Sequence, residues 1–249
     1  MTGRVAQIWR HPIKAHGREA LEQVDLTKGR TLPWDRVWAV IHEQTKADGS
    51  EWAHCVNFTR GAKVASLQAI NAQLDEDNKE ITLTHPDRPN LTFRPGGSAS
   101  EFIEWVHPLM PTDRAASVGI VSTPNRGMTD SDFPSISLLN LASNAEVEQR
   151  LGQTLSMERW RGNICFDGFP AWKEFDWIGE QLQIGSAVLE IRERIGRCLA
   201  TTVNTKSGKR DADTLGTLKQ GWDHTDFGVY GYVIESGSVT IGDRIELLT

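Results

Sequence analysis

The residues best suited to chemistry surround Cys198, in the segment from Ile195 to Gly208 with the sequence IGRCLATTVNTKSG. Read as a strand from Arg197 to Asn204, this segment places Cys198, Ala200 and Thr202 on one small, polar face. Such a face fills a core poorly, so we expect it to border a cavity. We place Cys198 at the entrance of that cavity, where the preceding glycine lets another group approach the backbone closely.

Two chemical roles are open to Cys198. The neighbouring guanidinium of Arg197 would favour a thiolate over a thiol, because a nearby cation stabilises the charged form. A thiolate in a basic pocket suits a soft metal centre or a reactive sulfur. A free cysteine can equally be a small buried hydrophobe, and spacing alone leaves these roles open.

Basic residues are concentrated in two segments of an acidic chain. The 249 residues include 27 Lys and Arg against 33 Asp and Glu, a formal net charge of −6. One basic segment is the first eighteen residues, which contain no acidic residue; the other runs from residue 190 to residue 210 and contains Arg192, Arg194, Arg197, Lys206, Lys209 and Arg210. Taken alone, both segments could be ordinary solvated surface charge. The acidic total argues against non-specific nucleic-acid binding.

Several common catalytic motifs are absent from the sequence: the phosphate-binding P-loop, GxGxxG, HExxH, CxxC and GxSxG. The seven histidines are scattered, and His54 beside Cys55 is a weak zinc pair. Three cysteines are too few and odd in number for a disulfide scaffold, which predicts a reducing compartment. No signal-peptide pattern and no apolar stretch of membrane-spanning length are found, so we predict a cytoplasmic protein without a membrane span.

The elements that must position these residues are mostly strands. In the first half, strands are predicted at 37–41, 81–84 and 91–93, with short helices at 64–74 and 100–107. In the second half, Ser143 and Glu146 form a capping-box pattern for a helix at 144–151 that ends at Gly152. Strands are predicted at 182–191 and 197–204, and 229–234 with 239–248 should form a terminal hairpin.

The resulting fold class is mainly β with a few helices. Proline and glycine near 95–97 and the pair Pro108 and Pro111 mark the expected joint. We therefore predict a smaller β-barrel-like domain at 1–110 and a second β domain at 111–249.

Five sequence blocks, in order, resemble MOSC proteins that carry an N-terminal MOSC β-barrel domain, a group that includes the amidoxime-reducing proteins and their bacterial relatives. The first is the HPIK block at 11–14 with DRVW at 35–38. The others are SDFPSISLLN at 131–140, RWRGN at 159–163, GRCLATTVNTKSG at 196–208, and FGVY at 227–230 with IGD at 241–243. The likeness covers nearly the whole chain.

The resemblance implies a molybdenum cofactor of the molybdopterin type, with Cys198 as both the metal ligand and the catalytic residue. It implies that basic and polar side chains hold the cofactor's phosphate; the matching positions are Lys14, Arg36, Ser135, Ser137, Arg161, Asn163 and Arg197. It also implies reduction of small N-hydroxylated or other N-oxygenated compounds. Members of the family that the chain resembles are also described as binding pyridoxal phosphate.

A separate reductase or ferredoxin-like protein would have to donate electrons, because three cysteines cannot ligate an iron–sulfur cluster that needs about four. Two other functions stay open at this point. The chain could carry sulfur, or a sulfurated cofactor, through a persulfide on Cys198. It could also be a non-catalytic anion-binding module with an inert thiol.

Two positions depart from the family pattern. Gly162 stands where relatives often have proline, and Ala15 where they have serine or threonine, so each is expected to loosen one cofactor anchor. The chain also contains nine tryptophans. Trp160, Trp172 and Trp177 could line a substrate slot, or they could fill the barrel interior.

Overall fold

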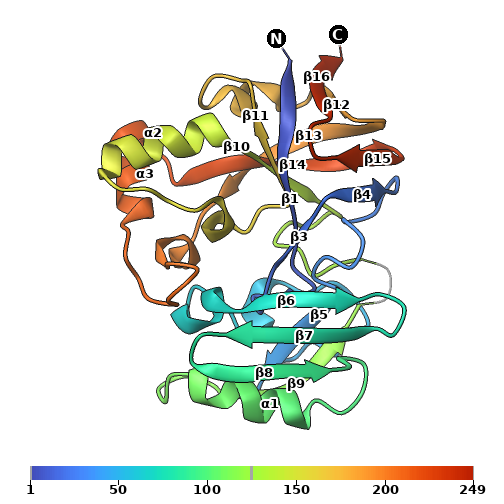
Figure 1. The fold of residues 1–249 in the computed structure, drawn as a ribbon, viewed down its shortest axis with the longest axis vertical. Helices are drawn as coiled ribbons and strands as arrows, with labels where there is room; N and C mark the ends of the chain where they lie inside the picture. The colour runs from blue at the N-terminus through green and yellow to red at the C-terminus, as the bar shows by residue number, and fades with distance from the viewer. Residues whose placement is uncertain (1, 124–125, 249) are drawn as a thin grey trace.

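A computed structural model describes residues 2–123 and 126–248. Figure 1 shows an upper part at the end where both chain termini are marked and a lower part built from segments of the first half of the chain. Among the described residues, no helix combines the length and the apolar character required to cross a membrane.

The upper part is a seven-stranded β-barrel with one additional strand. The barrel strands pair in the order β11, β10, β14, β13, β12, β16 and β1, and β1 closes the ring by pairing with β11, while β3 extends the sheet beyond β1. Their bounds are β1 Gly3–Arg10, β3 Glu19–Leu21, β10 Ile136–Asn140, β11 Ile164–Asp167, β12 Gln181–Ile184, β13 Ala187–Gly196, β14 Asp226–Glu235 and β16 Arg244–Leu248. Closure of the ring gives each barrel strand a neighbour on both sides, and the interior is filled by aliphatic and aromatic side chains.

Two helices cover one side of the barrel (Figure 1). α2 spans Leu141–Leu151 and α3 spans Thr214–Trp222. They pack over a second apolar cluster that includes Leu139, Val147 and Trp160. The N-cap of α2 is Asn140, whose side chain accepts a hydrogen bond from the Ala142 amide at 3.0 Å.

The lower part contains two three-stranded sheets. One has the order β2, β5 and β9, and the other has the order β6, β7 and β8. Their bounds are β2 Ile13–Lys14, β5 Trp38–His42, β6 Asn71–Asp75, β7 Glu80–His85, β8 Arg88–Phe93 and β9 Ser117–Ser122. The helix α1, Ser100–Val106, contributes Phe102, Trp105 and Val106 to the core of this part. The alternating burial of β6 and β7 fits sheets with one covered face.

The chain crosses between the two parts more often than a simple two-domain order requires. β1 lies in the upper barrel, and β4, Gln23–Leu26, pairs with β15, Gly237–Thr240. Conversely, β9 lies in the lower part, where it pairs with β5. The domain boundary at residue 110 stays a prediction, and the chain crossings place residues from both segments at the junction between the parts.

The structure confirms the mainly β fold and the helix near 100–107 and corrects five predicted elements, the last of which, at 197–204, is described with the site. The segment 64–74 is a 3₁₀ turn at Ala65–Ala69 followed by β6. The helix at 144–151 begins earlier, at Leu141, because Asn140 caps it and Ser143 donates to Glu174 inside the fold. Gly152 ends this helix with a positive φ of 71°, as expected. The segment predicted as one strand at 182–191 is two strands, β12 and β13, that meet at a turn.

The fourth correction concerns the predicted terminal hairpin, which does not form. β14 pairs with β10 and β13, whereas β15 pairs with β4 and β16 pairs with β12 and β1. The turn residues between 235 and 238 therefore do not pair the flanking strands with each other. Instead, β15 pairs with β4 from the first half of the chain, and β16 helps to close the barrel.

Candidate functional site

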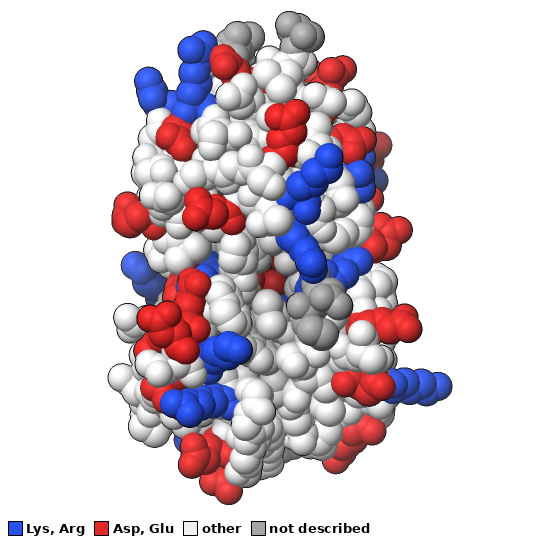
Figure 2. All heavy atoms as spheres, turned by 90° about the vertical axis from the view of Figure 1, so that its right-hand side faces the viewer, with Lys and Arg blue, Asp and Glu red and all other residues white. Residues whose placement is uncertain are grey.

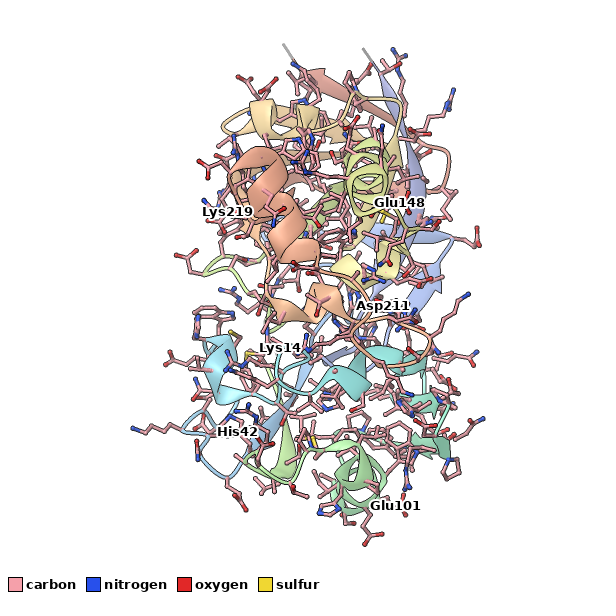
Figure 3. All side chains as sticks on the ribbon, turned by 90° about the vertical axis from the view of Figure 1, so that its left-hand side faces the viewer. Lys14, His42, Glu101, Glu148, Asp211 and Lys219 are labelled. Carbon is pink, nitrogen blue, oxygen red and sulfur yellow. The ribbon has the colours of Figure 1, made fainter. Side chains whose placement is uncertain are left out.

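A cavity at the junction of the two parts contains every predicted site residue. It encloses about 1030 Å³ of space not filled by protein atoms, including its open mouth. We call it the central cavity. The residues of the sequence-based site that line it are Lys14, Arg36, Ser135, Ser137, Arg161, Asn163, Arg197 and Cys198. Figure 3 shows Lys14 at mid-height, between α2 and α3 above and α1 below.

Lys14 reaches the cavity from β2, just after the chain leaves the barrel. Its Nζ atom donates to the carbonyl of Met128 and to the carboxylate of Asp130, both at 2.5 Å. Burial would raise the pKa of Asp130, but the charge of Lys14, supported by Arg36 and Arg161, lowers it below its usual value. Asp130 is therefore ionised at neutral pH and holds Lys14 in place.

Arg36 is fixed by a buried carboxylate. Asp35 accepts a hydrogen bond from the His11 amide at 2.8 Å and pairs with the Arg36 guanidinium. Burial opposes ionisation of Asp35, but Arg36 and His11 together keep its pKa below the usual range. Arg36 also donates to the carbonyl of Arg161 at 2.9 Å, which links the two arginine-bearing loops.

Arg161 lacks a carboxylate partner among the described residues. Its guanidinium donates to the Gly17 carbonyl at 3.2 Å and to Gln68 Oε1 at 3.4 Å. Burial, followed by the charges of Arg36 and Arg18, lowers the pKa of Arg161 to about 9. The folded protein thus holds a cation whose charge is under-compensated, and an anion in the cavity would stabilise it.

Three residues of the cavity wall have left-handed backbone conformations. The φ angles are 65° at Ala15, 55° at Arg36 and 51° at Arg161. Residues other than glycine adopt this region at a cost of about 1 kcal/mol or more. Strain of this kind persists where the surrounding structure dictates it and is concentrated at functional sites.

The small polar residues of the site lie at its buried end. Ser137 and Asn163 are bound to one another: the serine hydroxyl donates to Asn163 Oδ1 at 2.8 Å and accepts from the Asn163 amide at 2.9 Å. Ser137 lies in β10 and Asn163 directly precedes β11, so this pair links two adjacent, parallel strands. Ser135 accepts a hydrogen bond from the Ser131 hydroxyl at 2.6 Å. Each of these three side chains already has a protein partner, so their first role is to shape the wall.

Arg197 and Cys198 follow the end of β13. The predicted strand at 197–204 is wrong: Leu199–Thr202 form a 3₁₀ turn, and Cys198 is its N-terminal flanking residue. The Arg197 guanidinium donates to the carbonyls of Trp160, at 2.7 Å, and Phe227. It therefore fixes the backbone around the cavity. Cys198 is exposed, so its thiol lies at the cavity mouth and not in an apolar core.

The tryptophans do not form a substrate slot together. Trp160 lines the cavity and stacks on Phe227, with ring centroids 3.9 Å apart. Trp177 lies in the barrel core, and Trp172 packs beside Trp222 with ring centroids 4.6 Å apart. The alternative reading, in which most of these side chains fill the interior, is the correct one.

Sequence reasoning missed several residues of the wall. Cys55, Thr59, Arg60, Asp130 and Tyr230 also line the cavity. Tyr230 belongs to the FGVY block, but Cys55 and Arg60 come from a loop that carries no recognisable motif. The remaining cysteine, Cys165, is buried in the core, and burial raises the pKa of its thiol to about 12. Among the described residues, no group of three or more His, Cys, Asp and Glu side chains could hold a metal ion.

The two departures from the family pattern have structural counterparts. Ala15 lines the cavity with a methyl group, where a hydroxyl would add a donor. At Gly162, a Cβ atom would lie 2.3 Å from Leu139 Cδ1, closer than real contacts allow. Glycine at residue 162 therefore leaves the space that the side chain of Leu139 occupies in the core.

Basic side chains dominate the cavity. Its lining contains six of them, Lys14, Arg36, Arg60, Arg159, Arg161 and Arg197, against the single acidic side chain of Asp130. Figure 2 shows Lys and Arg side chains gathered at mid-height on one face, level with the junction between the upper and lower parts. The two basic segments of the sequence each contribute to this lining, through Lys14 and Arg197.

Comparison with curated proteins identifies amidoxime-reducing relatives. The chain is 23% identical over 286 residues to mitochondrial amidoxime-reducing component 1 of Homo sapiens, covering 99% of this chain and 83% of the relative. It is 28% identical over 295 residues to the human mitochondrial amidoxime reducing component 2, covering 98% and 83%. It is 32% identical over 130 residues to component 1 of Xenopus laevis, covering 47% of this chain and 37% of that relative.

Among solved structures, the YUAD protein from Bacillus subtilis matches with a TM-score of 0.48 and 13% identity, covering 99% of this chain and 96% of the other. Family models match both halves of the sequence. Residues 2–105 match the MOSC N-terminal beta barrel domain, and residues 127–246 match the MOSC domain. The chain therefore belongs to the MOSC-domain proteins that carry a MOSC N-terminal beta barrel domain.

Proposed function

We propose that the protein binds a molybdenum cofactor of the molybdopterin type in the central cavity and reduces N-hydroxylated or other N-oxygenated compounds. The observation that carries the proposal is that one cavity gathers basic residues from distant parts of the chain along its wall, together with an exposed thiol. The amidoxime-reducing names of the relatives support the reaction class.

The residues present fit the phosphate of such a cofactor. Arg161 is the residue that fits a phosphate most clearly, because its half-buried guanidinium lacks a carboxylate within the described part of the chain and its pKa is depressed. A phosphate would supply the missing negative charge, and arginine binds phosphate through parallel N–H donors. Lys14 and Arg36 lie in the same wall and would add further positive charge.

The thiol of Cys198 fits the metal end of the cofactor, since thiolates are preferred ligands of soft metal centres. When bound, the cofactor supplies the electron transfer and the acceptance of oxygen that this reduction requires. The protein contributes orientation: Arg197, the neighbour of Cys198, donates to the carbonyls of Trp160 and Phe227, and the Thr201 amide and hydroxyl both donate to the Cys198 carbonyl at 3.1 Å. Tyr230 stays protonated at neutral pH because burial, followed by the charge of Asp130, raises its pKa, so it can donate a hydrogen bond into the cavity.

The electrons would come from a separate protein, a reductase or a ferredoxin-like donor, because the chain has only three cysteines. The persulfide carrier is the rival that the test must distinguish, and no contact in the cavity favours it. The cytoplasmic location stays a prediction; the relatives named above are described as mitochondrial.

The test is reduction of benzamidoxime by the cofactor-loaded protein, with reduced methyl viologen as the electron source. We expect turnover by the wild type and none by Cys198→Ser, while Cys165→Ser, a substitution of the buried cysteine, retains activity. Cyanide-releasable sulfur on Cys198 without turnover would instead identify the carrier. Full turnover by Cys198→Ser would contradict the assignment.

A further inference from the structure

The exposed end of the central cavity has a second wall, formed by residues 55–62, that the proposed cofactor site does not use. Cys55, Thr59, Arg60, Gly61 and Ala62 all line the cavity. This wall belongs to the loop between β5 and β6, which includes a 3₁₀ turn at Cys55–Asn57.

This wall is fixed directly against the turn that follows Cys198. Arg210 donates to the Ala62 carbonyl at 2.9 Å and to Thr202 Oγ1 at 2.6 Å. Gln68 donates to the Ala200 carbonyl at 3.0 Å, and a Cβ atom at Gly61 would lie 3.7 Å from Ala200 Cβ. Arg60, which precedes Gly61, therefore lies at the same end of the cavity as the exposed thiol.

Arg60 is a cation without a carboxylate partner in the described ranges 2–123 and 126–248. Its side chain makes one weak contact, from a guanidinium nitrogen to Cys55 Sγ at 3.8 Å. Two other basic residues of the lining already form ion pairs with carboxylates: Lys14 with Asp130 at 2.5 Å, and Arg159 with Asp211 at 3.2 Å. Arg60 is half-buried, so the wall restricts where its side chain can lie, and a ligand at the cavity mouth can still reach its guanidinium.

The charge around this end favours an anion over a cation. Asp130 is the single acidic residue in the lining, and its carboxylate is held by Lys14. A cationic substrate would meet five further basic side chains and no free carboxylate, whereas a carboxylate would meet an available guanidinium. Arginine and carboxylate form parallel charge-assisted hydrogen bonds, which give both affinity and orientation.

We propose that Arg60 binds an anionic group of the substrate, so that the preferred substrates are N-hydroxylated compounds that also carry a carboxylate. This inference rests on the proposed function and adds the substrate class. The N-hydroxyl group would point toward Cys198 and the carboxylate toward Arg60. Arg60 is thus a specificity-determining residue supplied by the loop between β5 and β6.

The experiment compares benzamidoxime with 4-carboxybenzamidoxime as substrates of the cofactor-loaded protein. In the wild type, we expect kcat/KM to be at least tenfold higher for the carboxylated compound, mainly through a lower KM. In Arg60→Gln, the ratio of the two kcat/KM values should fall close to one. Arg60→Lys should restore part of it, because lysine keeps the charge but not the two parallel donors.

Lys63→Gln is the matched control, since Lys63 is an exposed cation three residues away that does not line the central cavity. It should leave the ratio unchanged. Calorimetric titration with the two amidine products, benzamidine and 4-carboxybenzamidine, gives a second readout without turnover: Arg60→Gln should weaken binding of the carboxylated amidine at least tenfold.

The outcomes separate the two proposals. Equal kcat/KM values for the two substrates in the wild type, or a preference that persists in Arg60→Gln, would overturn the role of Arg60 while the reductase function stands. If the wild type reduced neither compound, the proposed function would fail. The calorimetric comparison would then still decide whether Arg60 binds carboxylates.

Discussion

Replacing Arg161 by glutamine should stabilise the protein without cofactor and remove its response to phosphate. Burial and the neighbouring arginines lower the pKa of Arg161 from 12.5 to about 9. At about 1.4 kcal/mol per pKa unit, the charge costs at most about 5 kcal/mol. Two long hydrogen bonds, to Gly17 and Gln68, return roughly 1 kcal/mol each.

After the lost packing of the arginine stem is included, we expect a net gain of about 1–2 kcal/mol for Arg161→Gln. For a chain of this size, that corresponds to a rise in Tm of roughly 2–8 °C. Calorimetric melting of cofactor-free protein measures it. The matched control is Arg94→Gln, which removes an equal charge from a side chain that is 64% exposed and should shift Tm by less than about 1–2 °C.

The same melting experiment with inorganic pyrophosphate tests the anion site. A ligand present at ten times its Kd stabilises the folded state by about 1.4 kcal/mol, so the wild type should gain several degrees. Arg161→Gln should gain little. The reasoning is refuted if Arg161→Gln melts well below the wild type and pyrophosphate raises both melting temperatures equally.

Three further predictions concern packing, the cavity wall and pH. Gly162→Ala should destabilise the fold by about 1–3 kcal/mol in urea unfolding, because its Cβ would overlap Leu139. Adding Leu139→Val to the same chain should recover part of this loss. Additive effects of the two substitutions on the free energy of unfolding would contradict the contact. Ala15→Ser adds a hydroxyl to the cavity and should tighten pyrophosphate binding severalfold in calorimetry, whereas an unchanged Kd would show that residue 15 does not face the anion. Burial lowers the pKa of His11 to about 3 and that of His16 to about 4, so both imidazoles stay neutral in the folded state. The unfolded chain protonates the same imidazoles below about pH 6.5, so the free energy of unfolding should be highest above pH 6.5 and fall by about 4 kcal/mol on going to pH 5. His16→Gln should reduce that fall by about half. Equal pH dependence of urea unfolding in the wild type and in His16→Gln would count against the last prediction.

The sequence predicted which residues meet in the central cavity better than it predicted the local structure around them. Short apolar runs such as 37–41 and alternating runs such as 81–84 correspond to β5 and β7, because burial alone sets those patterns. The segment 197–204 alternates like a strand but forms a turn, since Gln68 and Arg210 from outside the segment hold its carbonyls. Long-range hydrogen bonds of this kind leave no periodic signal.

The same reason explains which site residues were found. Lys14, Arg161 and Cys198 lie in blocks that resemble a known family, so their meeting in one cavity could be anticipated from that resemblance. Arg60 and Cys55 lie in a loop without a motif, and they reach the cavity only because the loop between β5 and β6 packs on the turn after Cys198. The strand pairings of β1 with β11 and of β4 with β15 likewise join segments more than 150 residues apart, beyond the reach of local patterns.

The central claim is tested most directly by the molybdenum content of the protein purified from a host that makes the cofactor. Elemental analysis should find about one molybdenum atom per chain in the wild type and in Cys165→Ser, and almost none in a folded Cys198→Ser variant. Stoichiometric molybdenum in Cys198→Ser, or its absence from the wild type, would contradict the account.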